Sequence, residues 1–306
     1  MLVYLPIAEM PVNALLMLAL GGAVGFLSGM FGVGGGFLMT PLLMFAGVPS
    51  AVAVATGANP LIASSITGTI AQYRRKNVDI KLGLYLLAGG AAGSLGGVLI
   101  IRYLRQIGQV DLFVSLLYVV FMGAVGGVML VESLRALNKV RKGQALPARR
   151  GAHHTWIHGL PFKTRFKASK LYISALPPVA IGALVGLMSG VMGVGGGFVM
   201  VPILIYLLHV PTNVAIGTSL FQVIFVSAIT TVLQAAANQT VDIVLAVFLM
   251  GGGVIGAQAG AAAGQHLRAE QLRLLLALLV LAVGLRLAAD LIAPSSLFSA
   301  TPAFRA

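Results

Sequence analysis

Apolar residues fill this chain in long runs, and short polar or glycine-rich segments separate the runs. A helix of about 20 apolar residues crosses the roughly 30 Å hydrocarbon core of a bilayer, so each run predicts a transmembrane helix. Strands of a membrane barrel would instead be short segments of alternating polarity. The predicted spans are 51–71, 82–101 and 112–131 in the first half of the chain, and 212–234, 243–264 and 272–292 in the second.

Two longer apolar regions, 12–47 and 174–208, precede these spans, and glycines interrupt both of them. The same six residues, "GVGGGF", occur at 32–37 and again at 193–198. An unpaired backbone amide in hydrocarbon is costly, so such a break is tolerated only where it is buried in protein or lines a polar cavity. Each region is either a re-entrant hairpin or two short crossings, and the pattern leaves both open.

The chain is an internal duplication. The stretch "GFLSGMFGVGGGFLMTPLL" at 25–43 aligns without gaps to "GLMSGVMGVGGGFVMVPIL" at 186–204. Two further pairs follow in step: "VPSAVAVAT" at 48–56 with "VPTNVAIGT" at 210–218, and "VDIKLGLYLLAGGAAG" at 78–93 with "VDIVLAVFLMGGGVIG" at 241–256. We therefore expect a first membrane repeat at 1–134, a polar and basic linker at 135–170, and a second membrane repeat at 171–306.

The basic residues predict how the chain is oriented. Lys and Arg number four in 74–81, ten in the linker and two in 265–273, against three on the opposite side of the predicted spans. By the positive-inside rule the linker is cytoplasmic and both termini are periplasmic. Each half then crosses an odd number of times, so the second half is inverted. The expected fold is an all-α polytopic membrane protein with two inverted-topology repeats, each holding a glycine-broken helical element and three transmembrane helices.

A glycine break followed by a helix start exposes backbone amides and the positive end of a helix dipole, which together attract anions. The competing explanation is that the glycines only let helices cross closely. Because the break occurs twice in opposite orientations, we expect two glycine loops to meet near mid-membrane and bind an oxyanion. The backbone of this candidate site is Gly34, Gly35 and Gly36 with Gly195, Gly196 and Gly197.

Polar side chains early in the span after each break are further candidates. Amide groups of Asn and Gln and hydroxyls of Ser and Thr can donate to an oxyanion, although hydrogen bonds between helices would use the same groups. Phe37 and Phe198 are candidate gate residues or core residues. The side-chain donors of the site are Thr56 and Asn59 in the first half, and Thr218, Ser219 and Gln222 in the second.

The few charged residues near the spans have simpler explanations. Asp79 and Asp242 begin matching spans, where a carboxylate caps a helix. Arg286 lies inside a predicted span with Asp290 one turn later, which favours an ion pair or a side chain that reaches the outer face. No carboxylate is evident in the middle of a span to carry a proton, and unwound carbonyls could coordinate sodium. The coupling ion, proton or sodium, stays open.

The two "GxxSGxxGVGGGFxxxPxL" blocks, each followed by "VP", resemble the sulfite exporter TauE/SafE family, also called the 4-toluene sulfonate uptake permease family. The resemblance maps onto Gly32 through Phe37 with Pro41, and onto Gly193 through Phe198 with Pro202. It implies a bacterial inner-membrane permease that moves small sulfur-containing oxyanions such as sulfite, sulfoacetate or other organosulfonates. The basic linker is longer than the minimal family pattern.

Other functions fit the sequence less well. An enzyme would need a nucleophile, an acid–base pair or a metal cluster at membrane depth, but the chain has no cysteine and its acids lie mostly at span ends. No nucleotide-binding loop occurs, and no cofactor or metal is expected. The net charge of +13 indicates loops at an anionic membrane face rather than a nucleic-acid partner. An anion channel, or a transporter of a non-sulfur organic anion, remains the alternative.

Overall fold

The computed structural model describes residues 2–31, 36–141, 163–166, 169, 171–264 and 269–292. Within these residues, five helices are long and apolar enough to span a membrane. Large apolar side chains such as Leu99, Val120 and Val247 are more than half exposed on the outside of the bundle, as expected for surfaces that face lipid. The chain is therefore an all-α polytopic membrane protein, as its hydrophobic pattern predicts. The five candidate spans are Ile80–Gln106, Val110–Arg135, Thr212–Asn238, Ile243–Gly260 and Leu274–Ile292.

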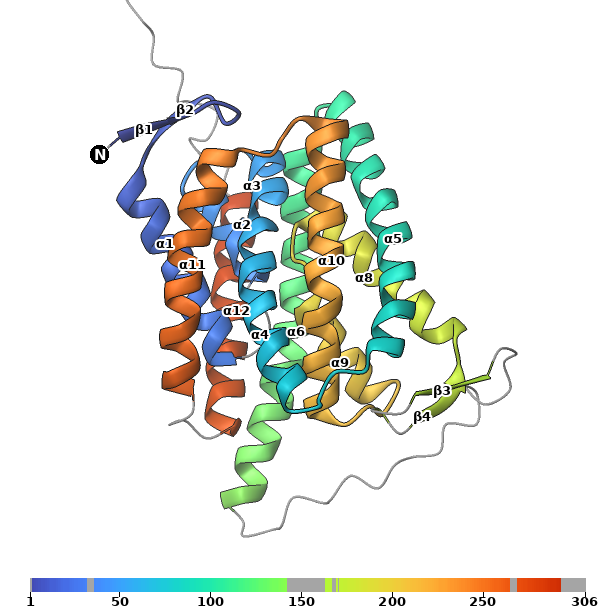
Figure 1. Ribbon diagram of the computed structural model, residues 1–306. Coiled ribbons are helices and arrows are strands. Elements are labelled where there is room, and N and C mark those ends of the chain that lie inside the picture. The colour runs from blue at the N-terminus through green and yellow to red at the C-terminus, as the bar shows by residue number, and fades with distance from the viewer. Residues whose placement is uncertain are drawn as a thin grey trace, which may run out of the picture.

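The two halves contain corresponding elements in the same order (Figure 1). The first half consists of β1 (Leu2–Leu5), β2 (Met10–Asn13), α1 (Ala14–Phe31), α2 (Gly36–Phe45), α3 (Ser50–Gly57), α4 (Asn59–Arg74), α5 (Ile80–Gln106) and α6 (Val110–Arg141). The second consists of β3 (Lys163–Phe166), β4 (Leu171–Ser174), α8 (Leu176–Met192), α9 (Gly197–Tyr206), α10 (Thr212–Asn238), α11 (Ile243–Gly264) and α12 (Ala269–Ile292).

Each glycine-broken region forms a long helix followed by a short one, α1 with α2 and α8 with α9. Helices α2 and α9 have 10 residues each. A helix of that length extends about 15 Å, or half of the hydrocarbon core. The predicted break between α8 and α9 is confirmed; in the first half, α1 ends at Phe31 and α2 begins at Gly36, and the residues between them lie outside the described part of the chain.

Two features differ from the predicted elements. The expected span 51–71 is divided into α3 and α4 at Ala58, because Pro60 has no N–H to bond the carbonyl of Thr56 and its ring crowds that oxygen. The aligned position in the second half is Gln222, and α10 continues through it without a break. Each half also begins with an antiparallel β-hairpin, β1–β2 and β3–β4, which the hydrophobic pattern did not predict.

Helices α4 and α10, which correspond in the two halves, run in opposite directions in the view of Figure 1. In Figure 1, α4 leads to a connection with α5 at the bottom of the view, whereas α10 leads to a connection with α11 at the top. Helix α6 continues to Arg141 and strand β3 begins at Lys163, so both enter the range predicted as the linker. The rest of that range lies outside the described residues apart from Ser169.

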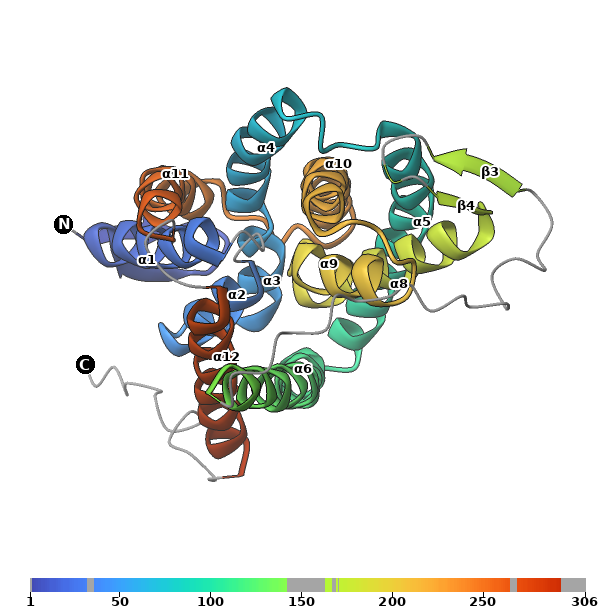
Figure 2. The ribbon, with the colours of Figure 1, turned by 90° about the horizontal axis from the view of Figure 1, so that it is seen from below.

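The closest helix pairs join the two halves. Helix α1 packs along α11, α8 packs along α5, and α6 packs along α12, as Figure 2 shows from below. Helices α4 and α10 lie together between these pairs. The long helix of each broken element therefore has its main partner in the opposite half.

Glycines at every fourth position make the first two pairings possible. A Cβ at Gly21 would lie 2.6 Å from the carbonyl oxygen of Leu249, and one at Gly190 would lie 2.7 Å from that of Ser94. Only glycine lets two backbones approach so closely, as in the small-residue interfaces of membrane helices. We call these two interfaces the glycine seams: Gly21, Gly25 and Gly29 against Gly252, Gly256 and Gly260, and Gly89, Gly93 and Gly97 against Gly182, Gly186 and Gly190.

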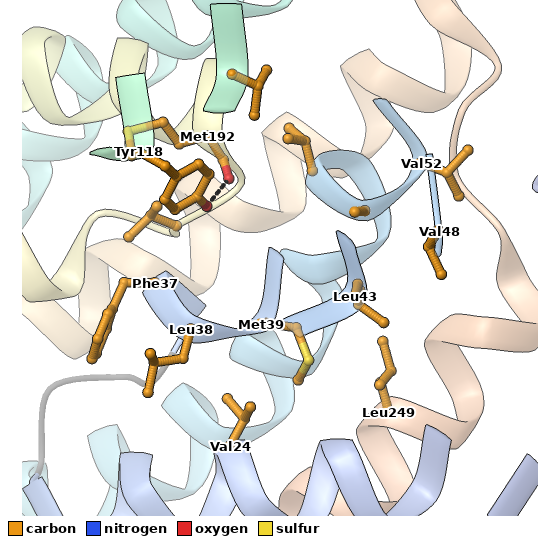
Figure 3. Close-up of a cluster of buried hydrophobic side chains, with 14 of the residues drawn as sticks. Val24, Phe37, Leu38, Met39, Leu43, Val48, Val52, Tyr118, Met192 and Leu249 are labelled. Atoms are coloured by element: carbon orange, nitrogen blue, oxygen red, sulfur yellow. Dashed lines mark hydrogen bonds between the residues drawn. The ribbon is translucent and has the colours of Figure 1, made fainter. Parts of the chain in front are cut away.

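One large cluster of buried apolar side chains contains residues of both halves. Phe37, Leu38 and Met39 from α2 pack in one cluster with Met192 from α8 and Leu249 from α11 (Figure 3). All five side chains are almost fully buried. The short helix α2 is therefore held by residues of the second half.

We predict that Gly93→Leu prevents stable folding, whereas Gly96→Leu on the same helix does not. A Cβ at Gly93 would overlap the backbone of Ala183, while one at Gly96 meets nothing within 4 Å. Forcing the helices apart should cost about 1–3 kcal/mol or more. Size-exclusion profiles and thermal unfolding of both variants in detergent measure the difference. Equal stability of the two variants would contradict the seam.

Candidate functional site

The second glycine break is a tight loop between α8 and α9. Gly193, Gly195 and Gly196 have φ angles of 70°, 67° and 77°, a region that favours glycine. Helix α9 begins at Gly197, so the amides of Gly197 and Phe198 have no partner within the helix, whereas the amides of Val199 and Met200 donate to the carbonyl of Gly196 at 3.2 and 2.9 Å. In the first break, Gly34 and Gly35 lie outside the described residues, and Gly36 is the first residue of α2.

The two broken elements meet at the start of their short helices. The rings of Phe37 and Phe198 stack with their centroids 4.2 Å apart and an angle of 23° between the planes. Phe121 of α6 meets Phe198 edge-on at 6.1 Å. The structure thus brings together the ends of the two "GVGGGF" segments, and a gating role for Phe37 and Phe198 stays a prediction.

The carbonyl of the last residue of α8, just before the second break, accepts hydrogen bonds from side chains of the first half. The carbonyl oxygen of Met192 accepts hydrogen bonds from Thr40 Oγ1 at 3.1 Å and from the Tyr118 hydroxyl at 2.5 Å. Figure 3 shows the Tyr118 bond. Carbonyls at a helix end have no partner within the helix, so these two donors stabilise the end of α8 in an apolar core.

Asn59 and Gln222 are buried amides with unused donors. Asn59 Oδ1 accepts a hydrogen bond from Thr231 Oγ1 at 2.9 Å, but Asn59 Nδ2 has no partner. Gln222 is fully buried, and neither its oxygen nor its nitrogen has a partner. Leaving such groups unpaired costs about 1–3 kcal/mol each. Donors kept free at this cost are suited to binding an anion.

Two further buried hydroxyls were missed by the sequence analysis. Continuing the alignment of 48–56 with 210–218 places Ser65 of α4 opposite Ser227 of α10. Both side chains are fully buried and neither hydroxyl has a partner. Ser227 Oγ lies 3.0 Å from the position a Cβ would take at Gly195, so it faces the second glycine loop. Ser65 and Ser227 occupy matching positions in the two repeats, and this match could have identified them from the sequence.

The remaining predicted donors take part in hydrogen bonds within the protein. Thr56 Oγ1 accepts from the amide of Asp242 at 3.1 Å, and Thr218 Oγ1 accepts from the amide of Asp79 at 3.0 Å. Ser219 Oγ donates to the carbonyl of Ile216 at 2.9 Å. Gln222 makes no such bond, and its Nε2 lies toward Gly90 of α5, 3.0 Å from the position a Cβ would take there. Thr56 and Thr218 therefore tie the two halves together, and their role as ligands stays a prediction.

The capping role of Asp79 and Asp242 is confirmed. One oxygen of each carboxylate accepts from an amide in the first turn of its helix, Leu82 N or Leu245 N, at 3.1 Å. The second oxygen binds the hairpin region of the opposite half: Asp242 Oδ2 accepts from the amide of Ile7 at 3.0 Å, and Asp79 Oδ2 accepts from the amide and hydroxyl of Ser169 at 2.9 Å. Both carboxylates are buried, so each hairpin is clamped to a helix of the other half.

An open cavity of about 570 Å³ lies at the end of the bundle beside the β1–β2 turn. Arg105 Nη1 donates to the carbonyl of Asn238 at its wall. Asn238 in turn donates to Gln234 Oε1 at 2.5 Å, and Gln234 Nε2 donates to the carbonyl of Gly190 at 3.0 Å. This bonded chain ends at Gly190, and the hydroxyls of Thr230 and Ser227, farther along α10 toward the glycine break, are buried without partners.

Arg286 lies apart from this polar region. It is exposed on α12, with its guanidinium carbon 4.5 Å from the centre of the Phe45 ring. That arrangement stabilises a cation through the ring face. Among the described residues, the buried polar groups around the two breaks are neutral.

A bundle of membrane-spanning helices, in which two broken helices meet beside buried and unpartnered polar groups, defines a multi-pass membrane transporter. The family model described as "Sulfite exporter TauE/SafE" matches residues 17–287, and the chain belongs to that family. No solved structure matches this chain significantly.

Relatives from distant organisms have corresponding names. The chain is 28% identical over 280 residues to "Probable membrane transporter protein YunE" of Bacillus subtilis (strain 168), covering 89% of this chain and 96% of that protein. It is 30% identical over 275 residues to a "Probable membrane transporter protein" of Xylella fastidiosa (strain Temecula1), covering 87% and 91%. A shorter match, 32% over 98 residues, covers 32% of this chain and 21% of "Sulfite exporter TauE/SafE family protein 3" of Arabidopsis thaliana.

We predict that Gln222→Leu weakens anion binding without destabilising the empty protein. The leucine removes two unpaired polar atoms from the interior, so thermal stability should stay the same or rise. The anion loses a donor, which should cost about 1–3 kcal/mol of binding free energy. Titration of purified protein with sulfite, beside thermal unfolding without ligand, measures both. Gln258→Leu, at an exposed position of α11, is the control. Unchanged affinity in Gln222→Leu would remove this residue from the site.

Proposed function

We propose that the protein is a secondary transporter that moves small sulfur-containing oxyanions, such as sulfite, sulfoacetate or other organosulfonates, across the bacterial inner membrane. The observation that carries this proposal is the meeting of two glycine-broken elements, one from each half, beside buried donors without partners. Membership of the TauE/SafE family supports a sulfur oxyanion as the substrate class.

The anion is held by neutral donors in this proposal. Amides of the α9 start, with Asn59 Nδ2, Gln222 Nε2 and the Ser227 hydroxyl, supply partial positive charge. A buried Lys or Arg would hold an oxyanion far more strongly at low dielectric. Several neutral donors that share the anion bind it more weakly than one buried cation would. Weaker binding allows the anion to be released on the opposite side of the membrane.

Transport by alternating access suits the duplication. The two halves act as inverted repeats in the membrane, which the opposite directions of α4 and α10 support. Rocking of one half against the other would expose a site at their interface first to one side and then to the other. The driving ion is a proton or sodium.

Flux into liposomes tests the proposed function. Purified protein is reconstituted and supplied with sulfite, thiosulfate, sulfoacetate, taurine and sulfate under an imposed proton or sodium gradient. We expect accumulation of at least one sulfur oxyanion above its equilibrium level, and dependence on one of the two gradients. Current that follows the electrochemical gradient of the anion alone would instead identify a channel.

Cysteine labelling tests the proposed orientation. The chain has no cysteine, so Arg149→Cys and Lys167→Cys in the basic linker provide single labelling sites. The predicted cytoplasmic linker should resist a membrane-impermeant maleimide in intact cells and react after permeabilisation. Gln109→Cys, in the exposed α5–α6 connection, is expected to react in both conditions and serves as the matched control. The opposite pattern would invert the orientation.

A further inference from the structure

The side chain of Leu61 lies between Gly36 of the first half and Gly195 of the second. A Cβ at Gly36 would overlap Leu61 Cδ1 and lie 2.7 Å from Cδ2. A Cβ at Gly195 would overlap the same Cδ1 atom. Gly36 and Gly195 belong to opposite halves, so one methyl group of Leu61 touches the backbone of both halves.

The neighbours of Leu61 are the candidate anion donors. Ser227 Oγ lies beside the same face of Gly195, and Asn59 precedes Leu61 by two residues in the first turn of α4. Leu61 itself is 3% exposed. Its isobutyl group thus fills the volume from which an oxyanion would reach the glycine backbone and these donors.

The second half has a smaller residue at the equivalent position. The alignment of 48–56 with 210–218 pairs Leu61 with Val223, whose Cγ1 lies 3.4 Å from the Cβ position of Gly195. Both residues approach the same glycine from neighbouring helices, α4 and α10. The three atoms nearest the Cβ position of Gly36 all belong to Leu61, so Leu61 contacts a glycine of each half.

The position of Leu61 at a helix break gives it a way to move. Helix α4 begins at Asn59, directly after the interruption at Ala58 that Pro60 imposes. An element that ends at a break can shift against its neighbour by small backbone rotations. A shift of the first turn of α4 would withdraw Leu61 from both glycines at once.

From this geometry we propose that Leu61 is a specificity-determining residue, whose side chain limits the size of the anion that reaches the two glycine segments. This inference rests on the proposed function. An inorganic anion such as sulfite needs only a small withdrawal of Leu61. An organosulfonate must place its carbon chain where the Leu61 side chain lies.

Substrate size selection tests the proposal. Liposome flux is measured for sulfite, methanesulfonate, propanesulfonate and pentanesulfonate with the wild-type protein, Leu61→Ala and Leu61→Phe. We expect Leu61→Ala to raise the ratio of pentanesulfonate to sulfite flux at least tenfold, and Leu61→Phe to lower the ratio of propanesulfonate to sulfite flux at least tenfold. Leu220→Ala is the matched control, because Leu220 packs on Gly68 of α4 and is not among the nearest neighbours of Gly36 or Gly195.

The outcomes separate this inference from the function on which it rests. If the wild-type protein moves none of these anions, the proposed function fails. If the wild-type protein transports them and folded Leu61→Ala keeps the wild-type size profile, the role of Leu61 is overturned. Size-exclusion profiles establish whether each variant folds. If Leu61→Ala does not fold, Leu61→Val, which removes less of the side chain, replaces it. We then expect a smaller shift in the same flux ratio, and the absence of any shift overturns the proposal.

Discussion

The close contact of glycine backbones between opposite halves is the constraint on which this structure depends. In lipid, the hydrophobic effect does not draw helices together, and close packing must supply the attraction. At the two glycine seams, carbonyl oxygens of one helix face the Cα atoms of the next, a geometry that permits weak C–H hydrogen bonds along the whole pair. Because α1 pairs with α11 and α8 pairs with α5, neither half can assemble its own broken element alone.

The site follows from these seams. Anchoring α1 and α8 on the opposite half fixes where each helix ends, and the short helices α2 and α9 then meet at Phe37 and Phe198. The clamps at Asp79 and Asp242 hold the hairpin regions at the two ends of the same framework. Within it, Gln222, Ser65 and Ser227 stay without partners. Buried polar groups are normally paired, so such a group of exceptions is expected at a functional site rather than in a purely structural core.

The sequence predicted five of its six proposed spans, the break between α8 and α9 and the two capping aspartates, because each depends on local composition or on spacing along the chain. It did not predict which helices pair, since hydropathy separates lipid from water and is the same for any apolar partner. The small-residue spacing of Gly21, Gly25 and Gly29 was visible, but its partner lies more than two hundred residues away. The break at Ala58 was signalled by Pro60, yet the apolar run around it continues without interruption.

For the candidate site, sequence reasoning named the glycines and the two amides as candidates but did not single out Leu61 or the paired serines. Leu61 reads as an ordinary apolar residue of a span, and only its contacts with Gly36 and Gly195 distinguish it. Thr56 and Thr218 were chosen by their matching positions, which the structure explains through their bonds to the amides of Asp242 and Asp79. Matching residues in the two repeats therefore indicate contacts between the halves as well as candidate ligand positions.

The pairing of α1 with α11 also has a consequence for biosynthesis. The glycine face of α1 leaves the ribosome more than 200 residues before its partner helix, Ile243–Gly264, has been made. At about 5–20 residues per second, α1 waits for roughly ten seconds or more in the membrane with its small-residue face uncovered. During that interval the insertion machinery, lipid or another helix of the nascent chain must cover this face, so the first half depends on the later synthesis of α11.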